Sequence, residues 1–110
     1  MLAITGSRAD YGLLSGPLRA IRETDGLDLR LAITGSHLLA AGASSRQEIL
    51  DDGFEIDAEI DPEQSGDSPQ HIAEATGRIT AAAAAVFVDQ PPDIALVLGD
   101  RYEMLSLIHI

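Results

Sequence analysis

Short apolar runs alternate along the chain with longer amphipathic stretches. The runs Leu2–Thr5 and Leu29–Thr34 are each followed at once by Gly-Ser, as is typical of buried parallel strands that end in a turn. The segment Phe54–Ile60 alternates strictly between apolar and polar residues, which predicts a strand with one solvated face at a sheet edge. The unbroken apolar run Ile94–Leu98 predicts a fourth strand, in the centre of the sheet.

The stretches between these runs have helical patterns. Apolar residues recur every three or four positions from Asp10 to Gly26, and Pro17 within this helix should kink it unless the helix begins later. Ser45–Glu48 matches a capping box and predicts a short helix that ends near Gly53. Ser68-Pro69 supplies an N-cap and a first-turn proline for a long, alanine-rich helix.

This alternation of strands and helices predicts an α/β fold: a doubly wound, Rossmann-like parallel sheet, with the chain ending at the start of a helix. Ligands bind such sheets beyond the carboxyl ends of the strands, where the strand order reverses. With the order 3-2-1-4, that crevice lies between the first and fourth strands. The turns Gly6-Ser7-Arg8 and Gly99-Asp100-Arg101 would then face each other.

Composition narrows the classes of function. A chain of 110 residues that is 45% hydrophobic is long enough for one domain. Its net charge of −11 argues against binding to nucleic acid or to an anionic membrane. It has no cysteine for a disulfide or a thiolate metal site, no signal-peptide pattern and no apolar run near the roughly 18 residues of a membrane span. We therefore expect a soluble, cytoplasmic protein.

The basic residues are all arginine, and Arg8 and Arg101 fall at predicted strand ends, where a guanidinium could bind phosphate bidentately. The first loop, Thr5–Gly12, has neither the three-glycine dinucleotide fingerprint nor the P-loop lysine, which argues against NAD binding and ATP hydrolysis. A turn before a helix N-terminus still favours an anion. Arg8 would either add to such a site or pair with Asp10 on the surface.

Two further residues follow predicted strands. Asp100 comes after the most apolar strand, where partial desolvation would suit a carboxylate to proton transfer, although aspartate is also a preferred helix N-cap. His37 could donate to a ligand, but it has no second histidine or acid at metal-ligand spacing. The residues alone leave both alternatives open.

Four segments, taken in order, resemble the hydrolysing UDP-N-acetylglucosamine 2-epimerases of sialic and legionaminic acid synthesis. Each segment is modest on its own, but the set spans the chain from Met1 to about Met104. The four segments are Thr5–Leu14, Thr34–Leu38, Asp52–Asp57 and Pro92–Glu103.

The resemblance implies the first part of the N-terminal, Rossmann-like half of a two-domain, GT-B-like enzyme. That family eliminates UDP from UDP-GlcNAc or a UDP-diacetamido sugar to leave a 2-acetamidoglucal, and then adds water to give N-acetylmannosamine or a related 2-epimer. The resemblance implies no metal and no nicotinamide or other cofactor. It also implies a homo-oligomeric parent enzyme with a UDP-sugar as its partner.

Site residues carry over by motif. Asp100 corresponds to a catalytic acid/base, and Arg8 and Arg101 match positions that contact UDP. Gly12 stands where some relatives have a serine near the nucleotide, so only its backbone could serve. His37 matches a family histidine in the substrate-binding set.

The chain also departs from the family pattern. Residues 1–104 correspond to a partial Rossmann-like domain, whereas residues 105–110 fit no family segment and are expected to be an atypical, non-native tail. A His-x-x-Gly-Gly-Glu segment that bears a second essential carboxylate in the family is absent. We therefore expect the chain alone to be inactive and marginally stable.

Two other classes compete with the epimerase. A GT-B glycosyltransferase half-domain would share the Rossmann-like fold but would not use the pair Asp100-Arg101 for elimination. A flavodoxin-like binding or signalling module of the receiver type would need an acid pair after its first strand and a lysine near its last. The chain has one acid in that loop and no lysine.

Overall fold

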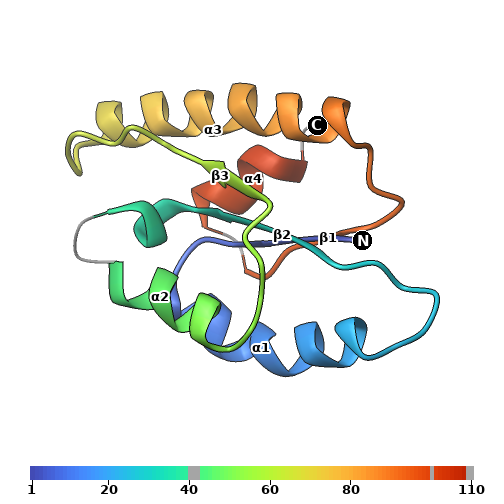
Figure 1. The fold of residues 1–110 in the computed structure, drawn as a ribbon. Coiled ribbons are helices and arrows are strands. Elements are labelled where there is room, and N and C mark those ends of the chain that lie inside the picture. The colour runs from blue at the N-terminus through green and yellow to red at the C-terminus, as the bar shows by residue number, and fades with distance from the viewer. Residues whose placement is uncertain (40–42, 100, 109–110) are drawn as a thin grey trace.

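A parallel four-stranded sheet lies between two layers of helices in the computed structural model, which describes residues 1–39, 43–99 and 101–108 (Figure 1). The strand order is β3-β2-β1-β4. This order confirms the predicted doubly wound sheet, with its reversal between the first and fourth strands. The strands are β1 (Leu2–Thr5), β2 (Arg30–Thr34), β3 (Ala58–Ile60) and β4 (Ala95–Leu96).

Helices cover both faces of the sheet. Two of them, α1 and α2, lie on one face, and α3 and α4 lie on the other, as Figure 1 shows. A 3-10 helix, η1, follows β2 directly. The helices are α1 (Arg8–Arg22), η1 (Gly35–Leu38), α2 (Ala43–Asp51), α3 (Pro69–Asp89) and α4 (Tyr102–Ile108).

The core consists of two apolar clusters, one on each face of the sheet. Successive side chains of a strand point to opposite faces, so Leu2 and Ile4 of β1 pack toward α3 and α4, whereas Ala3 packs toward α1 and α2. Leu18 of α1 and Ile79 of α3 are both fully buried, and each such burial stabilises the fold by roughly 2 kcal/mol. Both faces of the strands are thus held by helices.

Local capping signals set the starts of two helices. The amide of Asp10 donates to Ser7 Oγ at 3.2 Å, so α1 begins at Arg8, earlier than the apolar periodicity predicted, and it continues through Pro17. Ser68 accepts from the amide of His71 at 3.2 Å, and a proline occupies the first turn of α3. The predicted start of the long helix is confirmed.

The predicted capping box is wrong. Ser45 lies inside α2, which begins at Ala43, so it is not the N-cap, and its buried hydroxyl is hydrogen-bonded to Nδ1 of His37. The Ser-x-x-Glu pattern is local, whereas the partner of this serine comes from the preceding η1. The predicted end of the helix near Gly53 agrees with the structure.

The two outer strands differ from the prediction in length and place. β3 is shorter than Phe54–Ile60, but it does lie at the sheet edge. The prediction that Ile94–Leu98 forms a central strand is wrong for the described residues: β4 pairs only with β1, and Ile94 is 55% exposed. Apolar content indicated a strand here but did not give its position in the sheet.

Residues 105–108 form the second half of α4 and pack against α3. Ser106 and Leu107 are buried, and the Ser106 hydroxyl donates to the carbonyl of Thr76 at 3.2 Å. The domain boundary after residue 104 stays a prediction, and residues 109–110 lie outside the described residues.

Candidate functional site at the carboxyl ends of the strands

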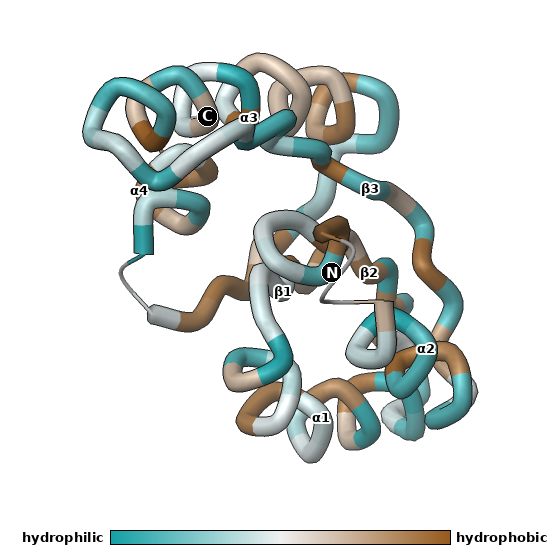
Figure 2. Tube along the Cα trace, turned by 90° about the vertical axis from the view of Figure 1, so that its left-hand side faces the viewer, coloured by the Kyte–Doolittle hydropathy of each residue, from teal (hydrophilic) through white to brown (hydrophobic). Residues whose placement is uncertain are grey.

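The loops that follow β1 and β2 are joined directly by hydrogen bonds. The amide and hydroxyl of Ser36 both donate to the carbonyl of Gly6, at 2.9 and 3.2 Å. Figure 2 looks onto this end of the sheet, where the turns after the strands lie between the two helical layers. The first two predicted loops are therefore brought together where the strand order predicts a ligand.

Gly35 allows the start of α4 to pack against the loops that follow β1 and β2. Its φ of +62° is a left-handed conformation that favours glycine. A β-carbon at this position would lie 2.6 Å from the Gly6 carbonyl oxygen and 2.8 Å from Glu103 Oε1. Any side chain at position 35 would therefore displace either the β1 loop or α4.

Arg101 forms a two-point ion pair with Glu103. The guanidinium Nε donates to Oε2 at 3.2 Å and Nη2 donates to Oε1 at 3.3 Å, and this carboxylate raises the pKa of Arg101. The Glu103 side chain is 1% exposed, whereas that of Arg101 is 56% exposed. The pair thus has a buried anionic end and a cationic end that reaches solvent.

Glu103 belongs to the Gly-Asp-Arg-Tyr-Glu segment but had no predicted role. The spacing of residues in this segment does indicate that Glu103 lies on the buried face of a helix. Glu103, Ser106 and Leu107 recur at three and four positions, which places them on one face of a helix, and all three are buried.

Arg8 and Gly12 lie in the first turns of α1. Arg8 is largely exposed and forms an ion pair with Glu48 across 3.6 Å, instead of the Asp10 pair considered from the sequence. Because exposed ion pairs contribute little, this contact leaves Arg8 available to a stronger anionic partner. Gly12 is exposed, and a β-carbon there would meet no atom within 4 Å.

His37 is buried beneath the site. Its Nε2 is hydrogen-bonded to Thr5 Oγ1 at 3.0 Å and its Nδ1 to Ser45 Oγ at 2.9 Å. Burial lowers the pKa of His37, against a smaller opposing effect of Asp10, the Ser7 carbonyl and Glu48. The ring therefore ties the end of β1 to α2. The predicted contact of His37 with substrate stays a prediction.

Asp10 is an acidic residue at this edge. Among the described residues, Oδ2 of Asp10 is buried without a hydrogen-bond partner, and it would lie 3.4 Å from a β-carbon on Gly6. Asp100, the predicted acid/base, lies outside the described residues. It immediately precedes Arg101 in the sequence, and its role stays a prediction.

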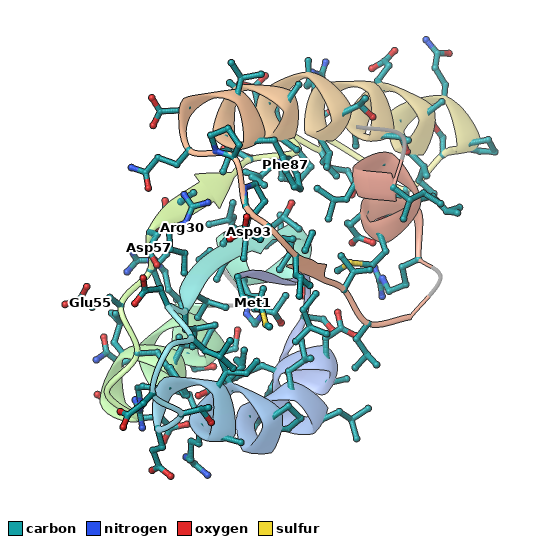
Figure 3. All side chains as sticks on the ribbon, turned by 90° about the vertical axis from the view of Figure 1, so that its right-hand side faces the viewer. Met1, Arg30, Glu55, Asp57, Phe87 and Asp93 are labelled. Carbon is teal, nitrogen blue, oxygen red and sulfur yellow. The ribbon has the colours of Figure 1, made fainter. Side chains whose placement is uncertain are left out.

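Cavities lie at the opposite edge of the sheet. Two of them, of about 330 and 350 Å³, share Asp57 in their linings, and Figure 3 shows Arg30, Asp57, Glu55 and Asp93 at this end. The carboxyl ends of α1 and α3 lie at this edge, and helix carboxyl ends repel anions. A phosphate group is therefore better placed at the other edge, at the N-terminus of α1.

The described residues contain neither a metal-binding cluster nor a membrane-spanning helix. No group of three histidine, aspartate or glutamate side chains could hold a metal ion among residues 1–39, 43–99 and 101–108. None of the helices in these ranges combines the length and apolar character that a membrane span requires.

The family model of the UDP-N-acetylglucosamine 2-epimerases matches residues 19–108. The chain belongs to this family. The family predicted from the resemblance of the four segments is confirmed. The glycosyltransferase and flavodoxin-like alternatives are set aside.

Relatives of this epimerase chain match nearly all of it. It is 35% identical over 106 residues to the UDP-N,N'-diacetylbacillosamine 2-epimerase (hydrolyzing) of Legionella pneumophila, covering 96% of the chain and 28% of the relative. It is also 35% identical over 107 residues to the polysialic acid biosynthesis protein P7 of Escherichia coli, covering 97% of the chain and 27% of that protein. The chain thus spans little more than a quarter of their length.

Solved structures agree on the fold. The UDP-GlcNAc 2-epimerase from Neisseria meningitidis bound to UDP-GlcNAc matches with a TM-score of 0.75 at 20% identity, covering 96% of this chain and 27% of that one. A putative UDP-N-acetylglucosamine 2-epimerase from Listeria monocytogenes matches with a TM-score of 0.79 at 21% identity, covering 96% and 26%. The predicted fold class, a Rossmann-like part of a GT-B-like epimerase, is confirmed.

Proposed function

We propose that this epimerase-family chain is the first part of the nucleotide-binding domain of a hydrolysing UDP-sugar 2-epimerase. The observation that supports this most is the family match over residues 19–108, which includes the loops after β2 and β4. The substrate is UDP-GlcNAc or a UDP-diacetamido sugar. The name of the relative from Legionella pneumophila, a UDP-N,N'-diacetylbacillosamine 2-epimerase (hydrolyzing), supports that substrate class.

The proposed reaction has two steps. A base removes the proton from C2 of the sugar, the electron pair forms the C1–C2 double bond, and the C1–O bond breaks so that UDP leaves with its bridging oxygen. Water then adds a hydroxyl to C1 of the 2-acetamidoglucal while C2 receives a proton on the opposite face. General acid–base groups serve both steps, and the diphosphate needs cationic support as it leaves.

The residues of this chain supply that cationic support. Arg8 begins α1, two residues beyond the end of β1, and Arg101 follows β4; these two strands are neighbours in the sheet. The N-terminus of α1 adds backbone N–H groups and the positive end of a helix dipole. Because the whole chain carries a net charge of −11, a diphosphate must be met by such local groups. Gly12 leaves the first turns of α1 open to a nucleotide.

Asp100 is the proposed acid/base, on the strength of the family motif and its place beside Arg101 in the sequence. His37 is assigned to the same site by the motif. Its contacts with Thr5 and Ser45 support the view that it holds the β1 loop in place beneath the substrate.

The remaining properties belong to the parent enzyme. We propose that it is a cytoplasmic homo-oligomer that binds neither nucleic acid nor membranes and needs no cofactor. We also propose that this chain by itself is inactive, because elimination needs groups on both sides of the C2 proton and the glycosidic oxygen.

Product analysis with the full-length parent enzyme tests the proposal. UDP-GlcNAc and UDP-N,N'-diacetylbacillosamine are each incubated with enzyme, and UDP and free sugar are quantified by chromatography. We expect equal amounts of UDP and of the 2-epimerised sugar from at least one of the two. A folded enzyme that leaves both intact, or one that releases UDP only when a sugar acceptor is added, would refute it.

A further inference from the structure

We infer that Glu103 is a positioning residue that fixes Arg101 so that the outer edge of its guanidinium faces the diphosphate of the nucleotide sugar. This inference rests on the proposed function. It adds a residue to the site that neither the family motif nor the relatives' names assign.

The Glu103 carboxylate is held in one place by its surroundings. It is 1% exposed, and Oε1 occupies the space beside the α-carbon of Gly35, where a β-carbon would come within 2.8 Å. The neighbouring Met104 is also buried, and its Cε would lie 3.4 Å from a β-carbon on Gly6. The loops after β1 and β2 therefore form the wall against which this carboxylate rests.

The geometry of the pair determines which donors of Arg101 remain available. A guanidinium has five N–H groups, and Glu103 accepts from Nε and from one N–H of Nη2. Both N–H groups of Nη1 and the second one of Nη2 lie outside this pair. These form the outer edge of the fork, which matches two oxygens of a phosphate.

The contrast in burial supports a positioning role. A carboxylate taken out of water loses hydration free energy, and an apolar residue could fill the same space at no such loss. Its partner Arg101 remains more than half exposed at the edge where the strand loops converge. The buried charge thus serves to direct an exposed cation, and Glu103 acts on the ligand only through Arg101.

A double-mutant cycle in the full-length enzyme tests this inference. Glu103→Gln, Arg101→Ala and the double variant are compared with wild type for UDP affinity by calorimetry and for kcat and KM with UDP-GlcNAc. Glu103→Gln should weaken UDP binding about 10-fold and raise KM more than it lowers kcat, because the orientation of a charge-assisted contact is lost. In the double variant UDP should bind no more weakly than in Arg101→Ala, because the two residues act as one unit.

Two further variants distinguish the proposed positioning of Arg101 from a general effect on folding and from an effect of its charge alone. Glu74→Gln removes another arginine partner, on the exposed face of α3, and should leave UDP affinity unchanged. Arg101→Lys keeps the charge without the fork and should lose about as much UDP affinity as Arg101→Ala. This lysine variant carries the test if Glu103→Gln fails to fold.

Three results would overturn the inference: unchanged or tighter UDP binding in folded Glu103→Gln, effects of the two single variants that add in full, or normal UDP affinity in Arg101→Lys. Failure of the epimerase proposal is distinguishable from these results. In that case the wild-type enzyme binds UDP but does not turn over UDP-GlcNAc or its diacetamido analogue, while the cycle on UDP affinity is still measured.

Discussion

The carboxylate of Glu103 fills the space that the absent side chain of Gly35 leaves at the end of β2. A β-carbon on Gly35 would lie 2.8 Å from Glu103 Oε1 and 2.6 Å from the carbonyl oxygen of Gly6. One glycine therefore lets the loops after β1 and β2 and the start of α4 meet at one point. The arginine of the proposed phosphate site, Arg101, is anchored at that point.

Gly35→Ala should be strongly destabilising. The left-handed φ costs a non-glycine residue about 1–2 kcal/mol, and the two short contacts raise the expected loss of unfolding free energy to roughly 2–4 kcal/mol. Urea unfolding of the 110-residue chain measures it. Gly77→Ala is the matched control: Gly77 is exposed in α3 with open space around it, so alanine should add up to about 1 kcal/mol. Equal stability of Gly35→Ala and wild type would contradict the packing described here.

His37 should make the fold sensitive to mild acid. Burial lowers its pKa in the folded state despite the facing acids Asp10 and Glu48, so below the unfolded pKa of about 6.5 the unfolded chain takes up a proton more readily. The contribution of neutral His37 to the free energy of unfolding is fully present above pH 6.5. It is lost as the pH falls toward the lower pKa of the folded state. Melting temperatures measured between pH 7.5 and 5 should fall more steeply for wild type than for His37→Gln.

His71→Gln provides the control for that experiment. His71 is partly exposed in the first turn of α3, where its ring is hydrogen-bonded to Ser68. Its replacement should leave the steep wild-type profile unchanged. Parallel pH profiles for wild type and His37→Gln would show that the buried histidine is not the cause.

Arg8→Ala in the full-length enzyme should raise KM for UDP-GlcNAc about 10-fold with a smaller effect on kcat. Arg8 is exposed, so its removal should not disturb the fold, and its exposed pair with Glu48 contributes little to stability. Steady-state kinetics measure the effect, and Arg78→Ala, on the far helix α3, is the control. An unchanged KM in Arg8→Ala would remove this residue from the UDP site.

Asp100→Asn separates the two roles that the sequence left open. Asparagine caps a helix about as well as aspartate, so a capping residue would tolerate the change, whereas an acid/base would lose on the order of 10²-fold or more in kcat. Turnover of UDP-GlcNAc by the full-length variant is measured together with its melting temperature. Near-normal turnover at unchanged stability would exclude Asp100 from the mechanism.

Most of the fold could be predicted from the sequence because the patterns that indicate its helices and strands are local. The N-cap Ser68 and the apolar periodicity of α1 depend only on neighbouring residues, and the alternation of strands and helices predicted the doubly wound parallel sheet. The candidate site could be predicted from the sequence only to the extent that the ends of the strands could be located. This sufficed to bring the loops of Arg8 and Arg101 to one edge.

Contacts between distant segments account for what the sequence did not reveal. The Ser-x-x-Glu pattern at Ser45 resembled a cap, but the serine is buried against His37, and no local pattern specifies that contact. Glu103 likewise received no role from the sequence, because its contact with Gly35 joins two segments far apart in the chain. The apolar composition of Ile94–Leu98 indicated a central strand, but an apolar strand has the same composition at the centre of a sheet and at its edge.

We expect the full-length enzyme built on this chain to epimerise a UDP-sugar by eliminating UDP and then adding water. The most direct test is proton NMR of the product formed from UDP-GlcNAc, or from its diacetamido analogue, in heavy water. Elimination removes the C2 proton and solvent replaces it, so each molecule of 2-epimerised sugar should carry one deuterium at C2, with an equal amount of free UDP. A 2-epimer that retains its original C2 proton, or a folded enzyme that releases no UDP from either sugar, would contradict the account.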